Sequence, residues 1–423
     1  MIRWLYIIFF AFLFACDTAS NVQSPTKNYF IKYFGRDGDQ TAVDLIVSND
    51  GTFYVLGNSR ITPDSIQNVY LAHANAQGEV IKQITYGSVE MNARDFVLTS
   101  DGKIAVVANK GVTSSNVDIL LSRFTLDLVP IDSIVLYAGA SNSFSEYANS
   151  LTELNNRDFI VEGYQTGNLH PFEEMHIKIY NQGTLVKAGP EWQQLNGSGT
   201  DNRGVKTFQH NSSSYYTFGT TNATYQSANK KFWAYPLPSN GSGTGNSDYS
   251  MFEKAGAGAE NNLTDVVKVS AGGYLLVGIS TSTTYRLKAS VTNSSDTAIV
   301  FSPAGIFQDL LLQDLGSDNG RGLAPPPFAT AYSSINNYNF VLANTYNTQG
   351  TSNILLMKIY NDLSTVWEDS IVQFGGDGDD TAAAVAELPD GHIVVLGTMQ
   401  LGNPPIQFKI ALMKLNSSGK LAD

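Results

Sequence analysis

Five aspartates in two short, glycine-rich stretches are the first candidate metal ligands in the sequence. Residues 35–39 read GRDGD and residues 375–380 read GGDGDD. Calcium prefers oxygen ligands and takes about 6–8 of them, so bound Ca²⁺ is one interpretation. The other is that the side chains cap backbone N–H groups in Asx turns and face water. The candidate ligands are Asp37, Asp39, Asp377, Asp379 and Asp380.

Other residue types that support chemistry are few. In HPFEEMH (170–176), His170 and His176 flank two glutamates and could bind zinc; the alternative is a polar loop between two strands. No G-x-S-x-G nucleophile elbow at a strand-to-helix turn and no P-loop is found. Carboxylate pairs for glycoside hydrolysis cannot be recognised, because their separation depends on the fold.

Aromatic residues gather between residues 215 and 235. Exposed aromatic rings stack on sugars or dock protein partners. The alternative is that these rings fill the protein core. The candidates for contact with a glycan or a protein are Tyr225, Phe232, Trp233 and Tyr235.

Cys16, the one cysteine of the chain, follows an apolar run from Trp4 to Phe14. That run is short for a membrane span and fits a secretory signal with Arg3 as its cation. The end of the run, LFAC, resembles the bacterial lipobox, which implies that residues 1–15 are a signal peptide. The resemblance also implies that Cys16 carries the lipid anchor, including palmitate-type acyl chains. The alternative is an ordinary signal peptide or a short anchor.

The rest of the chain is repetitive. After a polar tether at residues 16–27, a hydrophobic run broken by a hairpin-type turn and closed by a small residue recurs roughly every 57 residues. Each unit holds about four short strands without helical periodicity, which predicts an all-β fold, a β-propeller of seven four-stranded blades. A solenoid is the alternative. The closing residues are Gly57, Ala108, Gly163, Gly219, Gly278, Ala343 and Gly397.

The two ends of the chain predict how the ring closes. The seventh repeat ends at residue 423 without its last strand, whereas a spare strand, NYFIKYFG (28–35), precedes the first repeat. We expect this N-terminal strand to complete the last blade, because an open sheet edge would otherwise remain. The two acidic stretches would then lie next to each other on one face.

The pattern FGGDG…TAAAVAELPDGHIVVLG…FKIALMKLNSSGKL (374–421) resembles the bacterial propeller repeat of delta-60 type. The resemblance covers residues 28–423 and implies one propeller domain of a secreted or surface lipoprotein. Proteins with such repeats have no single activity in common, so the fold alone does not identify the function.

The composition of the chain limits the classes of function that fit it. The net charge is −12 and no basic run occurs, which argues against nucleic acid as a partner. We expect a lipoprotein of the bacterial outer membrane, on the periplasmic or the cell-surface side. The expected role is a non-catalytic binding or scaffolding subunit of an envelope complex with a protein partner. The alternative is an enzyme that acts on a glycan or peptide in the central channel.

The anchor can be tested directly. The Cys16→Ser variant has no acceptor for acyl chains, so we expect it to move from the membrane fraction to the soluble fraction of fractionated cells. Immunoblotting after a carbonate wash is the measurement. A variant that stays with the membrane would contradict the lipobox interpretation.

Overall fold

The computed structural model describes most of the chain between Tyr29 and Leu421. The described residues are 29–111, 116–136, 144–166, 172–188, 193–196, 201–212, 214–221, 231–238, 250–252, 260–268, 274–281, 285–292, 294–295, 298–299, 308–314, 329–333, 338–346, 351–360, 371–402 and 406–421.

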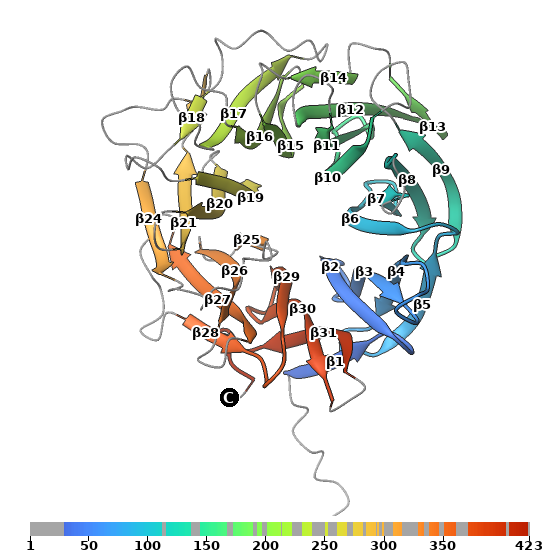
Figure 1. The fold of residues 1–423 in the computed structure, drawn as a ribbon, viewed down its shortest axis with the longest axis vertical. Helices are drawn as coiled ribbons and strands as arrows, with labels where there is room; N and C mark the ends of the chain where they lie inside the picture. Colours follow the sequence, from blue (N-terminus) through green and yellow to red (C-terminus); the bar gives the residue numbers. More distant parts are fainter. Residues whose placement is uncertain are drawn as a thin grey trace, which may run out of the picture.

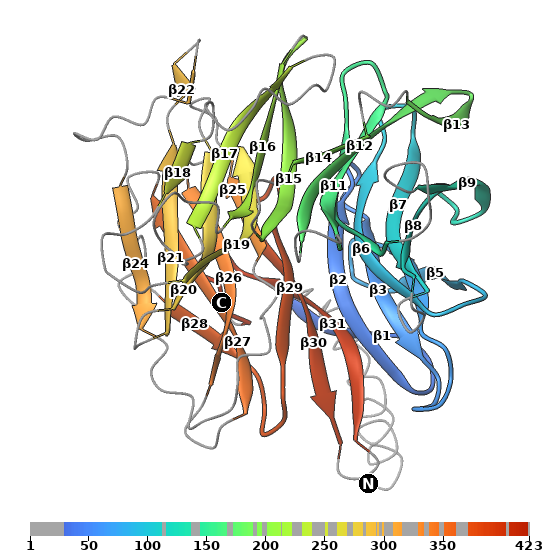
Figure 2. The ribbon, with the colours of Figure 1, turned by 45° about the horizontal axis from the view of Figure 1, so that its top comes forward.

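Within these ranges the fold is all-β, as the sequence predicted. The strands form antiparallel sheets, most of them four-stranded, arranged around a common centre with the first strand of each sheet nearest to it (Figure 1). In Figure 2 the sheets stand side by side in chain order. No described helix has the length and apolarity needed to cross a membrane.

The strands are grouped by sheet, in chain order. The first sheet contains β2 (Asp39–Val47), β3 (Phe53–Arg60), β4 (Asn68–Ala74) and β5 (Val80–Tyr86), and the second contains β6 (Met91–Leu98), β7 (Lys103–Lys110), β8 (Asp118–Thr125) and β9 (Pro130–Leu136). The third contains β10 (Glu146–Glu153), β11 (Phe159–Gln165), β12 (Glu173–Gln182), β13 (Thr184–Lys187) and β14 (Gln193–Asn196). The fourth contains β15 (Asn202–Asn211), β16 (Ser214–Thr221), β17 (Lys231–Pro238) and β18 (Ser250–Phe252). The fifth contains β19 (Glu260–Lys268), β20 (Tyr274–Thr281), β21 (Tyr285–Thr292) and β24 (Gln308–Asp314), with β22 (Ser294–Ser295) and β23 (Ala298–Ile299) as a separate short pair. The sixth contains β25 (Ala329–Ser333), β26 (Tyr338–Tyr346), β27 (Ser352–Tyr360) and β28 (Ile371–Phe374). The last contains β29 (Thr381–Glu387), β30 (Ile393–Leu401), β31 (Gln407–Leu415) and β1 (Phe30–Phe34).

The N-terminal strand β1 is the outer strand of the last sheet. It pairs antiparallel with β31, with Phe34 opposite Ile410. Both side chains belong to an apolar cluster that also includes Val55 and Tyr70 of the first sheet. β1 and β31 therefore lie side by side and share one core with the first sheet.

The turns follow from the Asp-Gly pairs of the sequence. Gly51 and Gly391 have φ angles of 80° and 82°, a region that glycine enters without steric cost. The N–H of Gly51 donates to the carbonyl of Ser48, and that of Gly391 donates to Leu388, both at 2.9 Å. These hydrogen bonds close the hairpins between the first two strands of the first and last sheets.

Neighbouring sheets are joined by a recurring inter-sheet hydrogen bond. The innermost strand has a register shift in six of the sheets, as expected of β-bulges. At five junctions, the backbone N–H before the shift donates to an Asn or Thr side chain of the preceding sheet. The pairs are Ala42 with Thr398, Ala93 with Asn58, Ala148 with Asn109, Leu263 with Thr220 (2.8 Å each) and Ala382 with Asn344 (2.7 Å).

The small residue that closes each repeat directly precedes this acceptor position. A Cβ on Gly57 would lie 2.5 Å from the carbonyl oxygen of Thr41 and 2.5 Å from a methyl group of Ile410. A Cβ on Gly397 would lie 2.4 Å from a methyl group of Ile354. Since Ile410 and Ile354 come from the preceding sheets, the closing glycine allows neighbouring sheets to pack closely.

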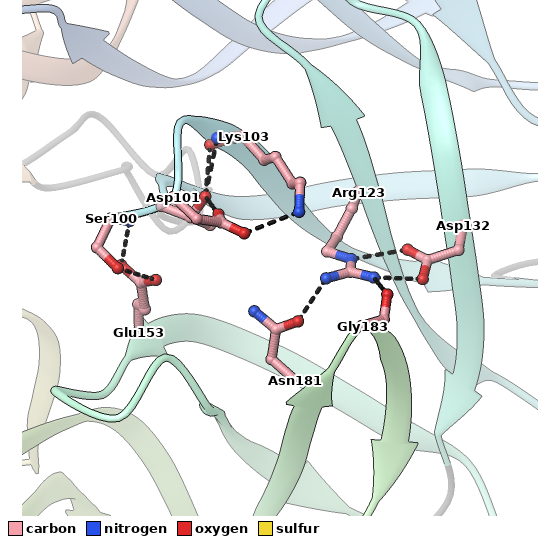
Figure 3. Close-up of polar contacts among 9 residues, drawn as sticks. Ser100, Asp101, Lys103, Arg123, Asp132, Glu153, Asn181 and Gly183 are labelled. Atoms are coloured by element: carbon pink, nitrogen blue, oxygen red, sulfur yellow. Dashed lines mark hydrogen bonds and ion pairs between the residues drawn. The ribbon is translucent and has the colours of Figure 1, made fainter.

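A buried arginine joins the second sheet to the third (Figure 3). The Arg123 guanidinium is 1% exposed and forms a two-pronged ion pair with Asp132, with Nε 2.7 Å from Oδ1. Its remaining donors reach the Asn181 side chain at 2.5 Å and the Gly183 carbonyl at 2.9 Å, both at the turn between β12 and β13. Planar donors of this kind suit several acceptors at once.

Candidate functional site

The innermost strands bring three aspartates and a lysine together. Asp44, Asp95, Lys206 and Asp265 each follow the register shift of their strand, on β2, β6, β15 and β19. The Lys206 ammonium lies 3.6 Å from Oδ1 of Asp265 and also interacts with the other two carboxyl groups. The Asp44 and Asp95 carboxyls are within hydrogen-bonding reach of each other. These four residues form the inner-strand cluster.

Backbone N–H groups hold the aspartates in place. In all three, Oδ1 accepts a hydrogen bond of 2.8 Å from the N–H of the next residue. Oδ2 of Asp95 also accepts the N–H of Leu151 from the third sheet, at 2.7 Å. The cluster is therefore part of the contact between sheets.

The pKa values of Asp44 and Asp95 are both raised. Loss of hydration, together with the neighbouring charge of Asp95, raises the pKa of Asp44 well above its ordinary value. Loss of hydration also raises the pKa of Asp95, although the Lys206 ammonium and the hydrogen bond from Asp44 oppose that rise. The rise is larger for Asp44 than for Asp95, because the charge of Asp95 opposes ionisation of Asp44, while Lys206 favours ionisation of Asp95. Burial would lower the pKa of Lys206, but the three carboxyls outweigh it and raise that pKa.

The cluster is open to water in part. The Lys206 side chain is 31% exposed and that of Asp265 is 18% exposed, so a polar ligand can reach them. A carboxyl group with a raised pKa, such as that of Asp44, suits the role of a general acid. Asp44 interacts with Asp95 directly, whereas glycosidase carboxyls stand at least about 5 Å apart to flank a glycosidic bond. The arrangement suits binding of hydroxyl or amide groups better than hydrolysis by that pair.

The predicted acidic stretches form capped loops. In the first, Oδ1 of Asp39 accepts the N–H of Phe408 at 3.0 Å, and Lys409 Nζ donates to the Gly38 carbonyl at 2.8 Å. Lys409 thus brings a second cation to a loop where the sequence placed Arg36 alone. Asp37 precedes Gly38 in the same loop, and its carbonyl accepts a hydrogen bond from Gln40.

The second loop is capped in the same way. Oδ2 of Asp380 accepts the N–H of Gly376 at 2.7 Å, and its Oδ1 accepts that of Gln400 at 2.9 Å. Oδ1 of Asp379 accepts the N–H of Ser352 at 3.1 Å. Among the described residues, three potential ligand atoms lie within 4.8 Å of one another only in the group Glu162, Glu174 and His176, which none of the five aspartates joins. Calcium at these loops stays a prediction.

The aromatic candidates do not form a binding surface as far as they are described. Phe232 and Trp233 are 1% and 2% exposed, so the prediction that they contact a glycan or protein is wrong for these two. A Cβ on Gly278 of the next sheet would lie 2.5 Å from the Phe232 ring, because the ring fills the space between the sheets. Tyr225 and the Tyr235 side chain lie outside the described residues.

The segment HPFEEMH is not a polar loop where it is described. Glu173 to His176 belong to β12, and Glu174 and His176 are fully buried. His170 lies outside the described residues. The alternative of a polar loop is wrong for Glu173 to His176, because Glu174 and His176 are buried on a strand.

Sequence reasoning missed the inner-strand cluster, although the repeats contain its signal. Asp44, Asp95, Lys206 and Asp265 each lie 13 residues before the closing residue of their repeat. An alignment of the repeats with one another would have placed these charges at one level of the innermost strands.

The comparisons with known proteins give a fold and no family. No family model matches the sequence, and no curated protein matches it. The polysaccharide lyase Uly1 is 10% identical, with 95% of this chain and 94% of that chain covered and a TM-score of 0.50. A protein of unknown function from Dyadobacter fermentans is 8% identical over 91% and 98% of the two chains, with a TM-score of 0.44. At such identities the resemblance extends to the fold alone.

The raised pKa of Asp44 predicts a pH dependence of stability. Since the folded pKa of Asp44 is raised, its favourable contribution is full below about pH 4 and is lost as pH rises through the folded value. We expect Asp44→Asn to resist urea better than the parent at pH 8, and this advantage to vanish toward pH 4. Urea midpoints across that range are the measurement.

Asp64→Asn is the control, because it removes the same charge from an exposed loop. It should leave the pH profile unchanged. Parallel profiles for the parent and Asp44→Asn would show that the folded pKa of Asp44 is not raised.

Proposed function

We propose that this chain is a lipid-anchored, seven-bladed β-propeller that acts as a non-catalytic binding or scaffolding subunit of a bacterial envelope complex. The seven sheets are its blades, and β1 completes the last one. Support comes from the pairing of β1 with β31 and from the hydrogen bond between Ala42 N–H and Thr398. That bond repeats, at the junction of the last and first sheets, the contact made at four other junctions.

The anchor follows from the N-terminal segment. Residues 1–15 would be removed as a signal peptide, Cys16 would carry the lipid, and residues 16–27 would tether the propeller to the outer membrane. The propeller would then face the periplasm or the outside of the cell. A net charge of −12 supports a protein or glycan partner over nucleic acid.

Exposed apolar side chains on the outermost strands carry the proposal of a protein partner. These strands, β1, β5, β9 and β13, belong to consecutive sheets and lie on the periphery (Figure 1). Of the eleven large apolar side chains that are exposed among the described residues, seven lie on these strands or on the turn before β9. The outer-rim residues are Tyr33, Val80, Ile81, Leu126, Val129, Ile131 and Val186.

Such a surface is better suited to docking a protein partner than to facing solvent. Exposed β-branched residues on edge strands promote association, and gathered apolar side chains mark interaction sites. The aspartates of the inner-strand cluster, by contrast, are engaged with backbone N–H groups, and two of them touch. The outer rim therefore supports a binding role more strongly than the centre supports catalysis.

The alternative function is an enzyme that acts on a glycan or peptide at the centre of the ring. It is favoured by the raised pKa of Asp44, which lies beside Asp95 and Lys206, because a carboxyl group with a raised pKa can supply a general acid. Release of reducing sugars or peptides from envelope material by the purified protein, abolished in Asp44→Asn, would support this alternative over the binding role.

The binding role predicts that charges on the outer rim release the partner. After cross-linking in solubilised envelopes, we expect the double variant Ile81→Lys/Ile131→Lys to capture less partner than the parent, by a factor of about ten or more. The reason is that a lysine must lose its hydration on docking, which opposes binding. Quantitative mass spectrometry of the captured proteins is the measurement.

Ile61→Lys is the matched control, since Ile61 is 62% exposed but lies on the loop after β3. It should retain the partner. Equal capture by the parent and both variants, with unchanged melting midpoints, would contradict docking through the outer rim.

A further inference from the structure

The third sheet carries a buried cluster of acids and histidine on the face toward the fourth sheet. Glu162 on β11 lies directly opposite His176 on β12, and Glu174 points the same way because it is two residues along the strand. All three are 0% exposed, and one potential ligand atom from each lies within 4.8 Å of the others.

These three positions are apolar in each of the other sheets. The strand registers equate Glu162 with Leu56, Val107, Phe218, Val277, Leu342 and Leu396. They equate His176 with Leu71, Leu121, Ala234, Ala289, Leu356 and Leu412, and Glu174 with Val69, Ile119, Phe232, Leu287, Ile354 and Ile410. One repeat has thus replaced three contacting core residues with two acids and an imidazole together.

The fourth sheet is adapted to this cluster. Thr207 donates to Oε2 of Glu162 at 2.6 Å and lies 2.8 Å from the Thr217 hydroxyl, both fully buried. Gly204 leaves room for the carboxyl, because a Cβ there would lie 1.7 Å from Oε1 of Glu162. Polar groups and space are therefore provided from both sides of the junction.

One oxygen atom of the cluster is available to a ligand. Oε1 of Glu162 receives no hydrogen bond from any described residue, and a carboxylate oxygen of Glu162 lies within 4.8 Å of one of Glu174. Nδ1 of His176 lies 3.2 Å from Oε1 of Glu174. Two buried carboxylates in contact are costly unless a proton or a cation lies between them.

We infer that Glu162, Glu174 and His176 bind a divalent transition-metal ion, for which Zn²⁺ is the best match. Imidazole nitrogen and carboxylate oxygen are zinc ligands, and calcium, which takes oxygen, is a poor match for the histidine. Because Thr207 of the fourth sheet holds the Glu162 carboxyl, a bound ion would fasten the third sheet to the fourth. This junction lacks the Asn or Thr acceptor of five others and has Tyr164 in that place.

The test measures zinc content and thermal stability of the detergent-solubilised full-length protein. After EDTA treatment and removal of the chelator, we expect one equivalent of Zn²⁺ to bind and to raise the melting midpoint by about 5 °C. Calcium at the same concentration should leave the midpoint unchanged. Co²⁺ should give a visible absorption band.

Glu162→Gln and His176→Gln should each weaken zinc binding by at least about tenfold and abolish the midpoint shift. Glu146→Gln is the matched control, because Glu146 is equally buried in the same sheet and lies outside the cluster; it should bind zinc like the parent. If a variant does not fold, the melting midpoints of the parent protein with zinc and with EDTA test the site instead. The site would be overturned if the parent retained no zinc and its melting midpoint did not shift, or if both variants bound zinc as fully as the parent. A proton between the two carboxyls would then be the remaining explanation.

Discussion

The packing of neighbouring sheets depends on how five of the innermost strands satisfy one backbone N–H group. At the register shift of each of these strands, an N–H donates to the preceding sheet. Since an unpaired buried N–H costs about 1–3 kcal/mol, a neighbouring sheet that supplies an acceptor is held in place. Asn58, Asn109, Thr220, Asn344 and Thr398 do so from one position, directly after the closing residue. The requirement for a small residue beside that acceptor then follows from the close approach of the sheets.

Two junctions lack this acceptor, with Tyr164 or Ile279 after the closing glycine, and the junction of the third and fourth sheets is the more informative of the two. Tyr164 replaces the acceptor, and two other contacts join the sheets there. Asn149 donates to the Gly204 carbonyl at 2.6 Å, and Thr152 donates to the Thr207 carbonyl at 2.7 Å. A buried acid–histidine cluster lies beside these contacts. Polar residues in a core are retained only where something offsets their desolvation, so this junction is where a specific ligand is to be sought.

The sequence predicted the elements well because turns and closing residues are local signals. Asp-Gly turns and the small residue of each repeat fixed the hairpins, and the unfinished last repeat predicted where residues 28–35 would pair. Side-chain environments were harder. Trp233 was a candidate for contact with a partner, with burial in the core as the alternative, and it lies in the core; alternation along one strand does not tell which face a neighbouring sheet covers. The inner-strand cluster joins residues more than 200 positions apart, such as Asp44 and Asp265, so only the arrangement of the sheets around a common centre brings them together.

The most direct test of the account is the stability of a chain that lacks β1. If the N-terminal strand completes the last blade, a protein starting at Gly35 exposes the edge of β31 and the apolar cluster that Phe34 shares with the first sheet. The account predicts a melting midpoint lower by about 5 °C or more than that of a protein starting at Asn28, which lacks the tether alone. Equal midpoints for the two proteins would contradict closure of the ring by β1.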